Sequence, residues 1–268
     1  MITHIVTGGC SFSCPGRWPA ILQGVYPEKE YFNTGLSSAG NDCISHSILF
    51  QTQSLLNKGV NANQILILVM WSSFDRKSFW INPEETFDFQ DLNCDAQPHN
   101  PFQHHKPYLQ DPERDERGFL IGTAHCHTDN PNIRYWKRYF FQNYYNDEYA
   151  VIENYMHWQR VQWFCESKGV NILNLTFADL MHFPSMPWTE ETRIDWTLTT
   201  SKLKHAKFLQ DMIDFKTWWF YKDTGGLFDL VKDLKLGFEI DDMHPNQESH
   251  QYFTLNYLGP ELKKRFEL

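Results

Sequence analysis

Short apolar runs separated by polar stretches divide this chain in the way that is typical of strands alternating with helices. The runs predict four strands, at 2–6, 31–33, 65–71 and 170–175. The third run begins with six consecutive aliphatic or Met residues, a pattern typical of a parallel strand that is covered on both faces. The pattern therefore predicts an α/β fold.

The segments between these runs predict the helices. One helix begins at Trp18, with Pro19 in the first turn, where the missing N–H costs nothing. The others are expected at about 42–57, 147–167 and 247–258. In 147–167 four residues recur at helical spacing and are expected to form a buried face rather than a binding platform: Tyr149, Ile152, Met156 and Trp163. Four consecutive rings in 216–221 are assigned to the core, with a sugar-stacking surface as the alternative.

Residues 77–146 break the alternation. Six prolines and many polar side chains in this stretch predict a long irregular insertion after the third strand. Ordered loops of this length are often lids or binding walls, so we expect the insertion to overhang the carboxyl edge of the sheet and to shape substrate choice. The chain, at 268 residues, is otherwise expected to form one domain, 1–268.

Composition narrows the range of partners. A formal net charge of −9 argues against general nucleic-acid binding, which depends on Lys and Arg. No stretch has the length of a transmembrane helix or the composition of a secretory signal, so we expect a cytoplasmic protein that does not bind membranes. The six cysteines form no Cys-x-x-Cys pair, which favours reduced thiols.

Two stretches at opposite ends of the chain supply the parts of a nucleophilic site. Ser11 follows the first strand and two glycines, and in α/β folds such strand-to-helix loops lie at the edge of the sheet where ligands bind. Asp241 and His244 form an Asp-x-x-His pair, in which a carboxylate can orient a histidine base. Cys10 is the alternative nucleophile, and His250 is expected only to pack or to cap a helix.

Histidines and a cysteine in the insertion suggest a metal site as an alternative interpretation of this segment. The candidates are His99, His104, His105, His125, Cys126 and His127. Their spacing matches none of the usual zinc patterns, so solvated loop histidines are favoured, and neither a metal nor a cofactor is expected.

Four stretches, in this order along the chain, resemble the sequence blocks of the SGNH (GDSL-like) hydrolase superfamily. They are 9–12 (Gly-Cys-Ser-Phe), 33–41, 65–76 and 241–245. The first block has Gly-Cys-Ser in place of the family's Gly-Asp-Ser, and the third lacks the family's Asn. The chain also resembles SGNH-like proteins encoded by large tailed phages, which implies the host cytoplasm or the virion as its location.

The resemblance implies a three-layer α/β/α sandwich with a flavodoxin-like parallel sheet of about five strands. It also implies a triad of Ser11, His244 and Asp241, with Asp242 one residue out of register. The implied oxyanion donors are the N–H of Ser11, an N–H from Ser38 to Gly40, and Ser73 in place of the Asn. The residues implied to line the substrate site are Cys10, Asn41, Phe74 and Arg76.

The resemblance implies two functions. The first is a serine esterase or carbohydrate O-acetyl esterase that acts on a small-molecule or glycan ester through a covalent acyl-enzyme. The second is a weak or inactive SGNH-like domain with a structural or glycan-binding role, because the Asn of the third block is absent. Arg76, beside Asp75, suits a substrate carboxylate, a sugar hydroxyl or an internal ion pair.

Overall fold

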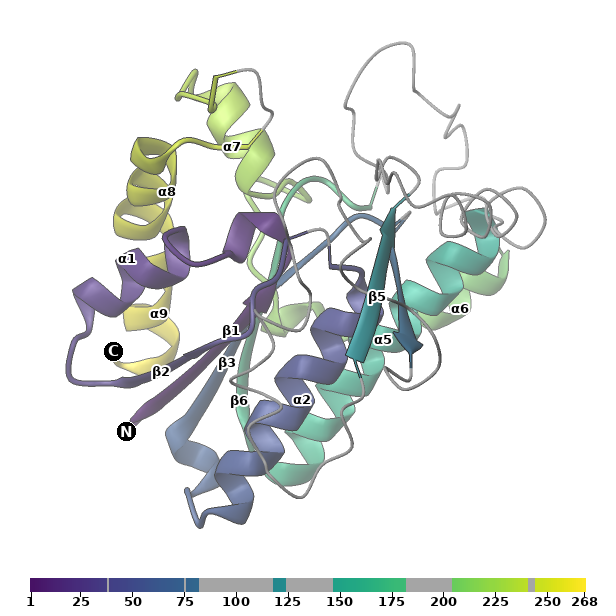
Figure 1. Cartoon of the computed structure of the whole chain (residues 1–268), viewed down its shortest axis with the longest axis horizontal. Helices are drawn as coiled ribbons and strands as arrows, with labels where there is room; N and C mark the ends of the chain where they lie inside the picture. The colour runs from purple at the N-terminus through teal and green to yellow at the C-terminus, as the bar shows by residue number, and fades with distance from the viewer. Residues whose placement is uncertain (38, 75, 82–117, 124–146, 182–203, 241–243) are drawn as a thin grey trace.

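A parallel sheet with helices on both faces forms the frame of the molecule. The computed structural model describes residues 1–37, 39–74, 76–81, 118–123, 147–181, 204–240 and 244–268. The sheet consists of β1 (His4–Gly9), β2 (Glu30–Asn33), β3 (Ile65–Trp71) and β6 (Asn171–Thr176). Their order is β2-β1-β3-β6 and all three pairings are parallel (Figure 1). This order is the flavodoxin-like one, and the predicted α/β class is confirmed.

About five strands were expected, and four pair in the described part of the chain. The fifth position, beside β6, holds a single parallel bridge between Asn174 and Trp218, where the Trp219 N–H donates to the Asn174 carbonyl over 2.9 Å. Trp218 is buried, and Trp219 and Phe220 pack against the core, which confirms the core assignment for this run of rings.

The helices divide between the two faces of the sheet. They are α1 (Trp18–Val25), α2 (Asn41–Asn57), α5 (Asp147–Lys168), α6 (Lys204–Asp211), α7 (Leu227–Asp233), α8 (Gln247–Phe253) and α9 (Gly259–Phe266). The chain passes from β1 to β2 in one direction and from β2 to β3 in the other, so right-handed crossovers place α1 and α2 on opposite faces. Accordingly α2 contacts α5, and α1 contacts α8 (Figure 1).

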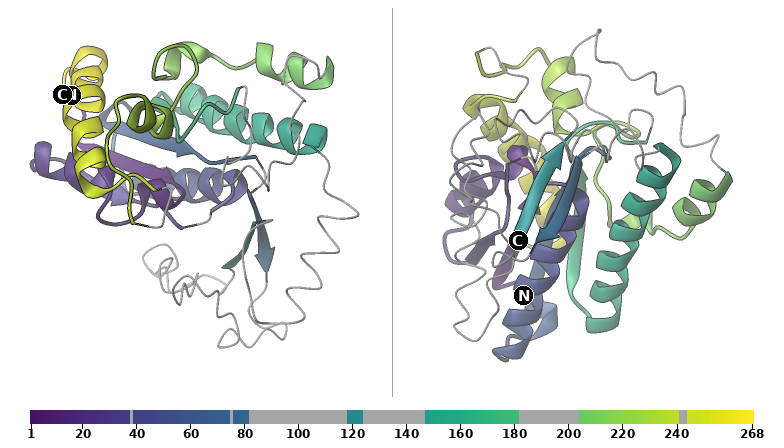
Figure 2. Two further views of the ribbon diagram at one scale, coloured as in Figure 1. Left: turned by 90° about the horizontal axis from the view of Figure 1, so that it is seen from above. Right: turned by 45° about the vertical axis from the view of Figure 1, so that its right-hand side comes forward.

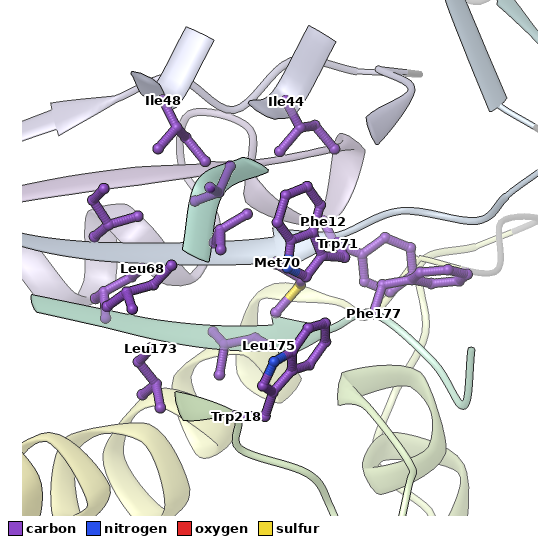
Figure 3. Packing of buried hydrophobic residues seen from close by; sticks show 14 of the residues in the cluster. Phe12, Ile44, Ile48, Leu68, Met70, Trp71, Leu173, Leu175, Phe177 and Trp218 are labelled. Carbon is purple, nitrogen blue, oxygen red and sulfur yellow. The ribbon is translucent and has the colours of Figure 1, made fainter. Parts of the chain in front are cut away.

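The core fills both sides of the central strands. All seven residues of β3 are buried, as the continuous apolar run predicts. Ile44 and Ile48 of α2 pack on one side of the strands (Figure 3), and on the other side Trp219 meets Phe253 of α8 edge-on, with ring centroids 5.4 Å apart. At the carboxyl end of the strands Phe12 meets Phe177 edge-on, with ring centroids 5.3 Å apart. The residue after Ser11 is thus anchored in the core.

The predicted buried stripe of α5 is wrong at three of its four positions, and only Ile152 packs against the core. Tyr149, Met156 and Trp163 are 51%, 55% and 48% exposed, whereas the core side of the helix carries Tyr155 and Trp158. Periodicity failed because this helix also buries amides that are hydrogen-bonded. The Asn154 amide donates to the carbonyls of Phe74 and Ala150. The Gln159 amide donates to the Leu209 carbonyl, and the Gln162 side-chain oxygen accepts from the Asp214 N–H.

The predicted insertion is not wholly irregular. It opens with β4 (Arg76–Ile81), which pairs antiparallel with β5 (Gly118–Thr123). Figure 2 shows this two-stranded ribbon standing apart from the main sheet. The Ser78 N–H donates to both carboxylate oxygens of Asp42, and Lys77 pairs with Asp42 and Glu153, so β4 is tied to the amino ends of α2 and α5. The expected overhang of Ser11 concerns residues outside the described part.

The carboxyl-terminal helix extends beyond the predicted 247–258. After α8 the chain makes a π-helical turn, Thr254–Leu258, and continues as α9 to Phe266. Pro260 stands in the first turn of α9, where its missing N–H is tolerated. Among the helices of the described residues, none has the length and apolar character needed to cross a membrane.

Candidate active site

Ser11 lies at the carboxyl edge of the sheet, directly beyond β1. Within the predicted strand-to-helix loop the chain forms a short 3₁₀ turn, Ser11–Ser13, and α1 begins at Trp18 as predicted. Gly9 allows the tight passage, because a Cβ at Gly9 would lie 2.3 Å from Ser13 Oγ and 2.7 Å from the Met70 carbonyl oxygen. Ser13 is buried and its Oγ accepts a hydrogen bond from the Trp18 indole over 3.0 Å. The turn that presents Ser11 is therefore held from behind.

The serine and the histidine predicted from opposite ends of the chain lie together. Ser11 Oγ is 2.6 Å from His244 Nε2, although 233 positions separate the two residues. Both side chains are partly exposed. The His244 ring also packs against Phe12, with ring centroids 5.1 Å apart. A partly exposed hydroxyl at hydrogen-bond distance from an imidazole is the arrangement that a serine nucleophile and its base require.

A short bridged loop carries His244 to this position. Phe238 and Pro245 form an antiparallel bridge, and the Glu239 N–H donates to the His244 carbonyl over 2.8 Å. Beyond the bridge Asn246 caps α8, since its side-chain oxygen accepts from the Ser249 N–H over 2.9 Å. His244 is thus fixed on one side by the bridge and on the other by the start of a helix.

Arg17 joins this loop to the serine turn. Its Nη1 donates both to Glu239 Oε1 and, over 3.3 Å, to the Pro245 carbonyl, which lie on the two sides of the bridge. Sequence reasoning missed both Arg17 and Glu239, because an ion pair across 222 positions leaves no local pattern. Arg17 is a positioning residue, since it acts on His244 only through the loop.

Replacing Arg17 by alanine is expected to lower kcat for any reaction in which His244 serves as the base of Ser11 by about 10- to 100-fold, because a misplaced base loses rate steeply with distance. KM should change little. Glu239→Gln should act in the same direction, and the double variant should be no slower than Arg17→Ala. Lys207→Ala, which removes an exposed ion pair with Asp211, is the matched control and should keep full activity. An unchanged kcat in Arg17→Ala would contradict the positioning role.

Three of the predicted polar groups lie outside the described residues. These are Asp241, Asp242 and Ser38. Of the other predicted oxyanion donors, Gly40 donates its N–H to Ser78 Oγ over 3.0 Å and is therefore removed from the set. Ser73 is fully buried, and its Oγ has no hydrogen-bond partner among the residues that the structure describes, so its part in an oxyanion hole stays a prediction.

Three of the four predicted substrate contacts belong to the interior instead. Cys10, Asn41 and Phe74 are 1%, 0% and 2% exposed. The Asn41 side chain accepts from the Ser72 N–H and donates to the Ser72 carbonyl, which ties the start of α2 to the end of β3. Phe74 packs edge-on against Trp158 with centroids 5.4 Å apart. Each therefore has a structural role, and burial equally disfavours Cys10 as the nucleophile.

A second histidine, His250, follows His244 by six residues and lies in α8. It is fully buried in α8, which fits the predicted packing role. Burial lowers the pKa of His250 to about 3, and the nearby charges of Arg17 and of protonated His244 act in the same direction. His250 is therefore neutral at neutral pH.

The metal alternative concerned residues of the insertion that lie outside the described part. Within the described part, no group of three or more His, Cys, Asp or Glu side chains could hold a metal ion. The cysteines described there, Cys10, Cys14, Cys43 and Cys165, are free thiols.

No protein-family model and no curated protein sequence matches the chain. Solved structures that resemble it include a member of the lipolytic protein G-D-S-L family from Veillonella parvula, at 10% identity, with a TM-score of 0.45 over 98% of this chain and 100% of that one. Another is an acetyl xylan esterase, at 10% identity, with a TM-score of 0.40 over 96% of this chain and 98% of that one. Likeness at this level leaves the chemistry to be argued from the residues of this chain.

Proposed function

We propose that the protein is a serine esterase. The observation that carries the proposal is the 2.6 Å approach of Ser11 Oγ to His244 Nε2 at the carboxyl edge of a parallel sheet, with both groups partly exposed. With the proton of the neutral ring on Nδ1, the serine hydroxyl donates to Nε2. His244 then takes this proton as Ser11 Oγ attacks the carbonyl carbon of an ester.

The reaction proceeds in two steps. The tetrahedral intermediate collapses as His244 returns the proton to the departing alcohol, which leaves an acyl group on Ser11. Water, deprotonated by the same histidine, attacks the acyl-enzyme and releases the acid. Asp241 is proposed to orient His244, three residues away in sequence. The Ser11 N–H is proposed as one oxyanion donor, with Ser38 and Ser73 as the others.

The proposed substrate class is an acetyl ester of a small molecule or carbohydrate. The second candidate function is a weakly active or inactive domain with a structural or glycan-binding role. Two observations favour this second function. The Gly40 N–H donates a hydrogen bond to Ser78 Oγ, and Ser73 is buried. Loss of a single oxyanion donor costs about 100- to 1000-fold in turnover, so a depleted set predicts slow catalysis.

Covalent capture of the nucleophile separates the two functions. A fluorophosphonate should add one phosphonyl group to the intact protein, detected as a mass increase, and peptide mapping should place it on Ser11. Ser11→Ala should not react, whereas Cys10→Ala should react as the wild type does. A wild-type protein that stays unmodified, or that is modified elsewhere, would refute the esterase proposal.

A further inference from the structure

Arg76, the first residue of β4, presents a buried positive charge without a counter-charge among the described residues. The residue is only 9% exposed, and its Nη1 is buried without a hydrogen-bond partner in the described part of the chain. Among the described carboxylates none forms an ion pair with it, while its neighbour Lys77 pairs with both Asp42 and Glu153. A buried guanidinium without an anion is costly, so such a site is suited to receive one.

The segment that carries this charge lies beside the serine turn, because Met70 near the end of β3 pairs with Gly9 at the end of β1. The Arg76 N–H donates to the Ser73 carbonyl over 3.3 Å, which closes the chain just beyond β3. A Cβ on Gly40 would lie 2.6 Å from the Arg76 carbonyl oxygen, so the segment after β2 also packs here. Burial and Cys10 together raise the pKa of the Cys14 thiol to about 12, while the charges of Arg17 and Arg76 act to lower it.

The turn between β3 and β4 also contains two hydroxyls that lack a partner among the described residues. Ser72 Oγ and Ser73 Oγ are buried and, like Arg76 Nη1, form no hydrogen bond within the described part of the chain. The nearby polar side chain of Asn41 differs, since its amide is satisfied by the Ser72 backbone and by Asn154. Of the three unsatisfied groups at this end of β3 only the guanidinium is charged, and the oxygens of an anionic group are the acceptors that it lacks.

We propose that Arg76 binds a carboxylate carried by the substrate, so that the preferred substrates are acetyl esters whose alcohol part is negatively charged, such as an acetylated acidic sugar. This inference rests on the proposed esterase function. The carboxylate must belong to the alcohol part of the ester, because an acetyl group itself carries no carboxylate. Guanidinium suits the role because its fork of N–H donors matches the two carboxylate oxygens.

The test compares a charged and a neutral ester of the same shape. The pair is 4-acetoxybenzoate and its methyl ester, and the quantity is the ratio of their kcat/KM values, charged over neutral. Arg76→Gln is expected to lower this ratio by about 10- to 100-fold, the range for a charge-assisted hydrogen bond, almost wholly through the charged ester. Comparing variants cancels the intrinsic difference in reactivity between the esters. Arg76→Lys should restore part of the ratio.

Lys77→Gln is the matched control, because it removes an adjacent cation that already has partners, and it should leave the ratio unchanged. Release of acetate from acetylated polygalacturonate and from acetylated xylan provides the same comparison on polymers. An equal loss of both ester activities in Arg76→Gln, with Arg76→Lys no better, would overturn the proposal in favour of a structural arginine. So would an Arg76→Gln variant whose ratio equals that of the wild type.

The outcomes also separate this inference from the esterase proposal. If the wild type hydrolyses the neutral ester and the ratio does not depend on Arg76, the esterase survives and the carboxylate site is refuted. If the wild type hydrolyses neither ester and does not react with the fluorophosphonate, both fail.

Discussion

Replacing Ser11 by alanine is expected to lower kcat/KM for p-nitrophenyl acetate by about 10³-fold or more, because the variant lacks the atom that forms the acyl-enzyme. His244→Ala should lose a similar factor, since its Nε2 stands 2.6 Å from Ser11 Oγ as the proposed base. The double variant should be no slower than either single one, because nucleophile and base act as a unit. Initial rates corrected for spontaneous hydrolysis give all three values.

Thermal unfolding of each variant shows whether a loss of rate is chemical. Ser11 and His244 are only partly buried, so their removal should leave the midpoint close to that of the wild type. A Ser11→Ala protein that keeps more than about a tenth of the wild-type rate would refute the nucleophile, given the losses that removal of a nucleophile normally causes. If instead wild type and both variants were equally slow, the structural or glycan-binding function would stand.

Local patterns predicted the parts of the fold in which one physical demand dominates. The observed β3, Ile65–Trp71, coincides with the predicted strand, because a strand covered on both faces must be apolar throughout. Ser11 and His244 were each found from a short local pattern, and the structure places their reacting atoms together. The first strand was predicted to end at residue 6, three residues early, since Thr7, Gly8 and Gly9 continue the pairing with β3 before the turn.

Predictions failed where a residue's environment depends on distant partners. On α5 the buried side includes Asn154, which is hydrogen-bonded to Asn41 of α2, so apolar spacing alone selected the solvent face. Asn41 itself was predicted to bind substrate, because the sequence does not show that Ser72 satisfies its amide. The ion pair of Arg17 with Glu239 was missed for the same reason, because its partners are far apart in sequence and no spacing rule could find it.

Gly35→Ala is expected to be the most destabilising small substitution at the site. A Cβ on Gly35 would lie 2.1 Å from the carbonyl oxygen of Ser13, which is backbone and cannot rotate away. Asn33 further holds this contact, because its amide donates to the same carbonyl over 3.1 Å and its oxygen accepts from the Gly35 N–H over 2.9 Å. Relief of the clash requires the serine turn to move, so we expect a loss of about 3 kcal/mol or more in the free energy of unfolding.

The movement should also displace Ser11, two residues before Ser13, so the folded fraction of Gly35→Ala should hydrolyse p-nitrophenyl acetate more slowly than the wild type. Gly24→Ala is the control, since it lies within α1 with no atom within 4 Å of the added Cβ, and it should stabilise the protein by about 0.5–1 kcal/mol. Urea unfolding measures both values. If Gly35→Ala stays within about 1 kcal/mol of the wild type, a typical cost for an ordinary substitution, the packing of the segment after β2 against the serine turn is looser than these contacts require.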